Sequence, residues 1–130
     1  MNYITDQITA LYSTPGAFDP SALVSVLDPG VVLHVPGAHP LSGDHVGLAG
    51  VGSFLERTRA TTDGGEHMEL IEVLSGTSHV GAYVTVTAHR DGRAPLVNHT
   101  IHLFRLGDDD RIAEIWFHNQ EQAPVDAFWR

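Results

Sequence analysis

The second half of the chain is a succession of strand-like segments, and no other feature constrains the fold as strongly. Four segments rich in β-branched and aromatic residues follow one another: EHMELIEVLSG, HVGAYVTVTAH, LVNHTIHLFRL and RIAEIWFHN. Short separators join them, and one separator contains Asp91-Gly92, a strong hairpin signal. Segments joined by hairpins pair as antiparallel strands of one sheet. The sequence from residue 66 onward therefore predicts a curved antiparallel sheet.

The first half carries helical periodicity instead. Ile4, Ile8, Leu11 and Tyr12 recur at helical spacing until TPGA, residues 14–17, ends the first predicted helix. A second, short helix is predicted within FDPSALVSVLDPG, residues 18–30, with an aspartate cap at its start and Asp-Pro-Gly at its end. The apolar stripe of this second helix consists of Leu23, Val24 and Leu27.

A strand over residues 31–35 and a third helix within residues 46–60 complete the predicted elements. The apolar side of the third helix consists of Leu48, Val51, Leu55 and Thr58. Helices followed by hairpin-linked strands indicate an α+β fold with the helices on one face of the sheet. The C-terminal APVDAFWR is expected to dock through Phe128 and Trp129, because two exposed aromatic residues at a terminus are costly.

Length and composition fit one globular domain over residues 1–130. The 130 residues are 42% hydrophobic, which suits a single core. No apolar run approaches the roughly 18 residues of a membrane span, and MNYITDQITALY lacks the basic and apolar regions of a signal peptide. We therefore expect no membrane partner and a cytoplasmic location.

Residue types that are missing exclude several kinds of chemistry. The chain has no cysteine and no lysine, which removes thiolate nucleophiles, thiolate metal sites and Schiff bases on lysine. A formal charge of −9 disfavours nucleic-acid binding, since phosphate backbones would be repelled. Nine histidines remain, so acid–base chemistry near neutral pH is what this chain is best equipped for.

Metal and cofactor binding are not expected. His99 and His102 point to opposite faces of a regular strand and cannot chelate one ion without a bulge. His39, Asp44 and His45 share a loop, but their spacing matches no standard ligand signature.

One strand face has an unusual polar character. Alternation along LVNHTIHLFRL places Asn98, Thr100, His102 and Phe104 on the same face. Either this face is exposed to solvent, or it looks into a cavity where a ligand or water satisfies the polar groups. His34 has the same ambiguity, because it closes VVLHV just before the chain turns at the rim of the sheet.

The sequence resembles the nuclear transport factor 2-like superfamily, particularly its SnoaL-like branch. The resemblance rests on VVLHVPGAHPLSGDHVG at 31–47, TAHRDGR at 87–93, IHLFRLGDDDRIAEIWFHNQ at 101–120 and VDAFW at 125–129. It implies a cone-shaped, strongly curved sheet that encloses a pocket closed by the N-terminal helices. It also implies a homodimer formed through the outer face.

The resemblance further implies candidate catalytic residues. The aspartate base of the ketosteroid isomerases falls on His34, and their later aspartate, which donates to the oxyanion, falls on His102. Tyr12 is a possible counterpart of their tyrosine donor. The SnoaL-like cyclases use a polar residue near the end of the last strand, which makes His118 a secondary candidate; an aspartate expected after that strand is Glu121 here.

Apolar side chains are expected to form the walls of the pocket. The candidates are Leu33, Val35, Phe54, Ile115 and Phe117, with Asn98, Thr100 and Phe104 from the polar face. Trp116 and Phe117 have opposite strand parity, so only one of them faces the cavity, and the register favours Phe117.

These observations lead to a hypothesis of cofactor-free proton transfer. His34 and His102 would act as base and oxyanion stabiliser on a small, mainly apolar substrate, giving isomerisation or a polyketide-type ring closure. Two alternatives stay open: a non-catalytic ligand-binding or dimerisation domain, and an epoxide hydrolase of the same fold. The hydrolase is disfavoured here because the interior strand positions are short of carboxylates.

Overall fold

The computed structural model describes residues 3–13 and 23–130. Its helices are α1 (Tyr3–Ser13), α3 (Gly47–Thr62) and α4 (Gln122–Trp129). Its strands are β1 (Leu27–Val35), β2 (Gly43–Val46), β3 (Glu66–Ser75), β4 (His79–Ala88), β5 (Leu96–Leu106) and β6 (Ile112–Asn119). Among the helices of these residues, none is long and apolar enough to cross a membrane.

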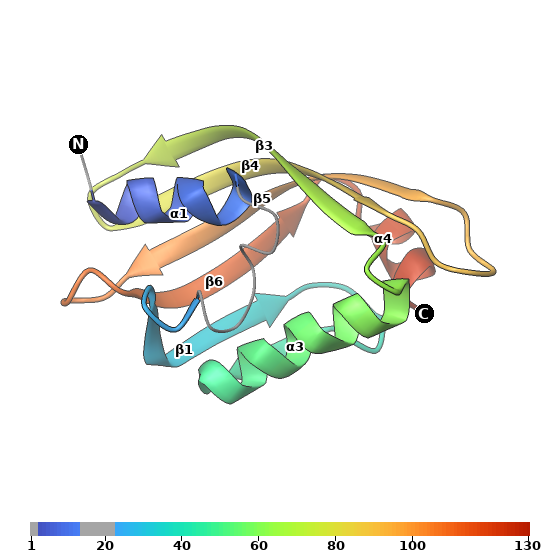
Figure 1. The fold of residues 1–130 in the computed structure, drawn as a ribbon, viewed down its shortest axis with the longest axis horizontal. Coiled ribbons are helices and arrows are strands. Elements are labelled where there is room, and N and C mark those ends of the chain that lie inside the picture. The colour runs from blue at the N-terminus through green and yellow to red at the C-terminus, as the bar shows by residue number, and fades with distance from the viewer. Residues whose placement is uncertain (1–2, 14–22) are drawn as a thin grey trace.

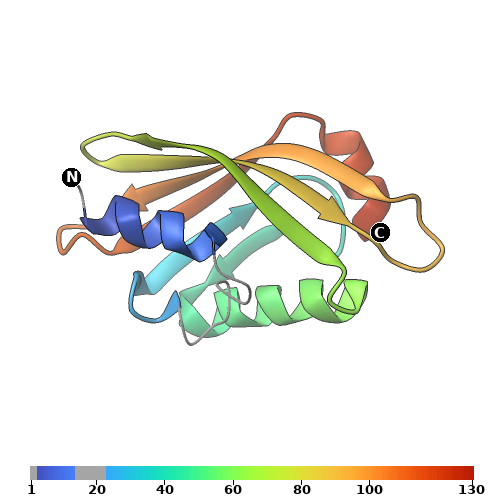
Figure 2. The same cartoon turned by 45° about the horizontal axis from the view of Figure 1, so that its top comes forward.

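The strands form one mixed sheet in the order β2-β1-β6-β5-β4-β3. The four strands β3 to β6 are consecutive antiparallel neighbours, as the hairpin pattern predicted, and only β1 runs parallel to its neighbour β6. The sheet is strongly bent, and Figures 1 and 2 show α1 and α3 on its concave side. The α+β prediction is therefore confirmed.

Side-chain alternation separates a buried concave face from an outer face. In β4, Val80, Ala82, Val84 and Val86 are buried, whereas Tyr83 between them is exposed. In β5 the buried positions are the even-numbered ones from Leu96 to Phe104. The polar face predicted from LVNHTIHLFRL thus lies beneath the helices and away from bulk solvent.

The predicted helices hold in part. The start of the second predicted helix lies outside the described residues, but its predicted end is wrong. Leu27 and Asp28-Pro29-Gly30 belong to β1, where Leu27 pairs with Ile112.

Two further predictions for the helices agree with the structure. In α3, Val51 and Thr58 are buried as predicted, and Phe54 and Thr62 are buried beside them. At the C-terminus, α4 docks through Phe128 and Trp129, which are 3% and 8% exposed, so that prediction is confirmed.

Candidate functional site

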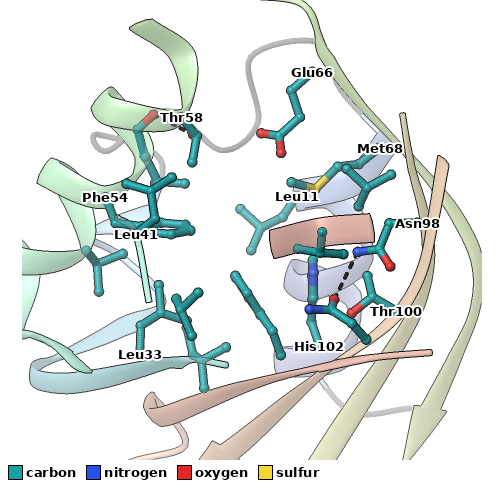
Figure 3. Close-up of a pocket in the computed structure, with 18 of the residues that line it drawn as sticks. Leu11, Leu33, Leu41, Phe54, Thr58, Glu66, Met68, Asn98, Thr100 and His102 are labelled. Atoms are coloured by element: carbon teal, nitrogen blue, oxygen red, sulfur yellow. Dashed lines mark hydrogen bonds between the residues drawn. The ribbon is translucent and has the colours of Figure 1, made fainter. Parts of the chain in front are cut away.

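A cavity of about 100 Å³ lies between the concave face of the sheet and the helices (Figure 3). Its wall is mainly aliphatic and aromatic. The polar residues that line it are Tyr12, His39, Thr58, Glu66, Asn98, Thr100, His102 and Asn119. An apolar enclosure with a few polar groups is the usual form of a small-molecule site.

The structure joins Tyr12 of α1 to His102 of β5 at the cavity wall. The Tyr12 hydroxyl lies 2.7 Å from Nδ1 of His102, and the His102 ring packs against Phe117 with centroids 4.3 Å apart. His102 is 4% exposed. Two candidates that are 90 positions apart in sequence therefore form one hydrogen-bonded pair.

Both members of this pair are neutral over the physiological range. Burial lowers the pKa of His102 to about 3 and raises the pKa of Tyr12 far above its ordinary value. A neutral imidazole whose pKa lies near 3 is a poor base at pH 7. It remains a good hydrogen-bond donor, and the described residues offer its Nε2 no partner.

Glu66, at the start of β3, is a cavity residue that sequence reasoning missed. Its carboxyl group points into the cavity, on the Thr58 side and well apart from His102 (Figure 3). No hydrogen-bond or ion-pair partner for it lies in the described part of the chain, and burial raises the pKa of Glu66 to about 7. The expectation that the interior strand positions are short of carboxylates therefore overlooked Glu66, which counts in favour of a hydrolase.

A sequence signal for Glu66 did exist. In EHMEL, Glu66 shares strand parity with Met68 and Leu70, and both of these pack against the core. An acid in phase with apolar residues is the pattern of an inward carboxylate.

The expected wall residues all lie at the cavity. Phe54, Asn98, Thr100, Phe104, Ile115 and Phe117 line it, as do Leu33 and Val35. Trp116 lies on the opposite face of β6, where it stacks on His34 with ring centroids 5.4 Å apart.

His34 does not face the cavity, so its pairing with His102 across one site must be abandoned. Its ring lies on the outer face of β1, where Nδ1 is 2.7 Å from Asp44 and Nε2 is 2.6 Å from Glu114. Burial alone would lower the pKa of His34, but the hydrogen bonds to these carboxylates outweigh it and raise the pKa. The physical reason is alternation: Leu33 and Val35 face inward, so His34 between them faces outward.

His118 and Glu121 are likewise outside the cavity. Phe117 and Asn119 line it, so His118 between them projects from the outer face, where it is exposed. Glu121 is exposed at the start of α4.

The prediction that His39, Asp44 and His45 share a loop is wrong for Asp44 and His45, which lie in β2, and both histidines are engaged with the backbone. Nδ1 of His39 accepts a hydrogen bond from the Leu41 amide at 3.1 Å, and Nε2 of His45 lies 2.8 Å from the Leu41 carbonyl. His39 also lines the cavity, and burial lowers its pKa. Within the described residues, no group of three or more His, Asp or Glu side chains is arranged so that it could hold a metal ion.

Comparison with known proteins places this architecture in a family. A model of the SnoaL-like domain matches residues 8–115. The chain belongs to the SnoaL-like domain family. This family includes polyketide cyclases and ketosteroid isomerases. Comparison with curated protein sequences gave no match.

Solved structures similar to this SnoaL-like chain cover it almost completely. Bal32a, from a soil-derived mobile gene cassette, has 23% identity and a TM-score of 0.89, over 98% of this chain and 96% of its own. A protein of unknown function with a cystatin-like fold from Xanthomonas campestris has 26% identity and a TM-score of 0.86, over 99% and 98%. TerC, co-crystallised with polyporic acid, has 19% identity and a TM-score of 0.79, over 96% and 97%. Other neighbours are NTF2-like or have a ketosteroid isomerase-like fold.

Proposed function

We propose that this SnoaL-like protein is a cofactor-free acid–base enzyme that isomerises or cyclises a small, mainly apolar carbonyl compound. The observation that carries the proposal is the neutral Tyr12–His102 pair, set 2.7 Å apart in an apolar cavity. Hydrogen-bond donors fixed in such surroundings stabilise an oxyanion far better than they would in water.

The pair acts on the carbonyl oxygen of the substrate. When the Tyr12 hydroxyl donates to Nδ1, His102 carries its proton on Nε2 and donates it toward the cavity. The phenol strengthens this donation by polarising the ring. Since both groups stay neutral, an oxyanion gains a hydrogen bond without having to displace a bound counter-ion.

Glu66 supplies the base in place of His34. Its carboxylate removes a proton from a carbon at the far end of an unsaturated carbonyl group, and the electron pair moves through the conjugated double bond to the oxygen held by His102. Return of the proton to a different carbon completes an isomerisation. Attack of the enolate carbon on a second carbonyl completes a ring closure. Because the pKa of Glu66 is about 7, the group takes up and releases protons at neutral pH.

The structural neighbour TerC supports a small-molecule ligand, because it was co-crystallised with polyporic acid on the same fold. The apolar wall of the cavity supports a substrate that is largely hydrocarbon.

Deuterium exchange tests the proposed proton transfer. We expect the protein to accelerate exchange of the γ-carbon protons of isophorone, a small unsaturated ketone, in D₂O, followed by NMR. Glu66→Gln is expected to lose about 10²–10⁴-fold of this rate, as removal of a general base does. Tyr12→Phe is expected to lose about tenfold, because it weakens one donor.

Matched controls lie on the outer face of the same sheet. Glu69→Gln on β3 and Tyr83→Phe on β4 make the same chemical changes at exposed positions, and both are expected to keep the wild-type rate. Exchange no faster than buffer, or a rate untouched by Glu66→Gln, would overturn the proposal and leave a binding protein as the better interpretation.

Epoxide hydrolysis is a second candidate that the position of Glu66 favours. A partly buried carboxylate that faces an apolar cavity is a group that activates water against an epoxide carbon. Hydrolysis of styrene oxide that depends on Glu66, without exchange of ketone protons, would select this reaction.

A further inference from the structure

A row of four polar side chains runs from the cavity to the loop between β1 and β2. Asn98 Nδ2 donates to Asn119 Oδ1 at 2.9 Å, and Asn119 Nδ2 donates to Gln122 Oε1 at 2.9 Å. Gln122 Nε2 donates to Asp126 Oδ1 at 2.9 Å, and the same oxygen accepts from the Ala38 amide at 3.0 Å. The row therefore ties β5, β6, α4 and the loop together.

Asp126 fixes the direction of every bond in this row. A carboxylate only accepts, and hydrogen bonds from Gln122 and Ala38 hold the pKa of Asp126 below its usual range. Gln122 Nε2 also faces the Pro36 carbonyl at 3.4 Å, a second acceptor, so the Gln122 amide cannot be reversed. Each side-chain amide in the row must then donate toward Asp126 and accept from its neighbour on the cavity side.

The consequence reaches the cavity at Asn98. Its nitrogen is committed to Asn119, which leaves its carbonyl oxygen as the group without a partner among the described residues. Asn98 is 8% exposed and lines the cavity. The row thus presents a hydrogen-bond acceptor whose orientation is set by a carboxylate at the far end of the network.

Thr100 provides a second unsatisfied group beside it. Its Oγ1 is fully buried and has no hydrogen-bond partner in the described residues. Thr100 follows Asn98 on the same face of β5, about 7 Å away along the strand, so one oxygen atom between the two side chains can bond both. A buried hydroxyl without a partner is costly unless something else occupies the site.

We propose that Asn98 and Thr100 form a subsite for a hydroxyl group of the ligand. The ligand hydroxyl donates to Asn98 Oδ1 and accepts from the Thr100 hydroxyl. This inference rests on the proposed function in that the ligand occupies the same cavity, and it narrows the substrate class to hydroxylated compounds such as phenols, enols or alcohols. Carboxylate ligands are disfavoured for two reasons. The described part of the cavity wall contains no arginine to pair with a carboxylate, and it contains Glu66, whose charge would repel one.

Matched pairs of compounds that exchange a hydroxyl for a methyl group provide the test. Phenol and toluene, 2-naphthol and 2-methylnaphthalene, and 4-phenylphenol and 4-methylbiphenyl are titrated into the protein by NMR. We expect the hydroxyl member of at least one pair to bind about tenfold more tightly than its methyl partner, the scale of one net hydrogen bond.

Variants locate the source of that preference. Thr100→Val and Asn98→Leu are expected to bring the two members of a pair to within about twofold of each other. Gln122→Leu, a positioning variant outside the cavity, releases the row and is expected to reduce the preference without touching the ligand. Thr87→Val, on the outer face of β4, is the matched control and keeps the wild-type ratio.

Several results would overturn the subsite. Equal binding of both members, absence of binding by every hydroxyl compound, or a preference that survives both Thr100→Val and Asn98→Leu would each do so. Glu66→Gln separates the two proposals: it abolishes proton exchange if Glu66 is the base, yet it leaves the hydroxyl preference intact. If the wild-type protein accelerates proton exchange but does not prefer the hydroxyl compounds, the subsite is refuted and the proposed function is not.

Discussion

The Thr100 hydroxyl is expected to lower the stability of the ligand-free protein while it strengthens ligand binding. This buried hydroxyl has no partner in the described structure, so removing it relieves a desolvation cost. We predict that Thr100→Val stabilises the ligand-free protein by about 1 kcal/mol in urea denaturation. Thr87→Val, at a partly exposed position, is expected to change little. A less stable Thr100→Val protein would show that the hydroxyl is satisfied in solution.

Individual residues also show where sequence reasoning about the site succeeded and failed. Asn98, Thr100 and His102 were placed at a cavity because alternation along one strand has a fixed period of two. His34 was chosen through resemblance and strand-end position, although the same alternation, applied to Leu33 and Val35, turns it outward. The partner relation between Tyr12 and His102 depends on how α1 docks on the sheet, which local pattern does not encode.

At the scale of elements, the β1–β2 loop depends on a glycine. Gly37 has φ +97°, and a Cβ there would lie 2.1 Å from Asp126 Oδ1 and 2.2 Å from Gln122 Nε2. We predict that Gly37→Ala destabilises the protein by about 2 kcal/mol or more, from backbone strain and from the broken row of amides.

The control for this prediction is Gly43→Ala. Gly43 has φ +111°, but no atom lies within 4 Å of the position that a Cβ would take there, so this variant reports backbone strain alone. Urea denaturation of both variants separates the two costs. Equal losses at the two glycines would contradict a role for the Asp126–Gln122 contact.

Elements were predicted well where the pattern is local and poorly where it is not. Hairpin turns and β-branched runs located β3 to β6 closely. The predicted end of the second helix failed because Leu27 pairs with Ile112, 85 residues away, and this contact extends β1 backward through a proline and a glycine. Pairing at such separation overrides local propensity.

For the whole molecule, opposing titrations predict a plateau of stability between about pH 4.5 and 6.5. The pKa of His102 is lowered to about 3, so its contribution is lost as pH falls below 6.5. The pKa of Glu66 is raised to about 7, so the folded protein binds this proton more tightly than the unfolded chain does. The folded protein therefore loses stability as pH rises above 4.5. These two slopes cancel between the limits, and the lowered pKa of His39 leaves only a shallow loss of stability there as pH falls. Above them, His34, whose pKa is also raised, loses its favourable charged state as well.

Glu66→Gln isolates one side of this balance. The variant removes a charge from a partly buried position, so it is expected to be more stable than the wild type at pH 8, on the order of 2 kcal/mol, and nearly equal at pH 4.5. Urea denaturation across pH 4 to 9 measures both. A Glu66→Gln protein that gains nothing at pH 8 would place the carboxyl group in water.

The outer face of the sheet is the surface through which a second copy of the chain is expected to bind. Tyr83 lies opposite Ile101, and Leu103 lies opposite Trp116, which gathers apolar side chains on the face that α1 and α3 leave open. We propose that this face forms a homodimer. Sedimentation at micromolar concentration should give a dimer for the wild type and a monomer for Ile101→Glu, whereas Thr77→Glu in the β3–β4 turn should leave the dimer unchanged. A wild-type monomer would refute this.

The parallel pairing of β1 with β6 has a consequence for how the protein is made. Antiparallel neighbours β3 to β6 close short loops, and β1 pairs with the nearby β2, but the other edge of β1 must wait for β6, which begins at Ile112. Contacts between distant segments form slowly, because the chain between them must first be ordered. During synthesis, the β1–β2 pair therefore leaves the ribosome long before β6 is available to join it to the rest of the sheet. The wall formed by β1 and α3 closes onto the rest of the sheet only after β6 has been made, so a growing chain that lacks β6 has no enclosed site in which to hold its ligand.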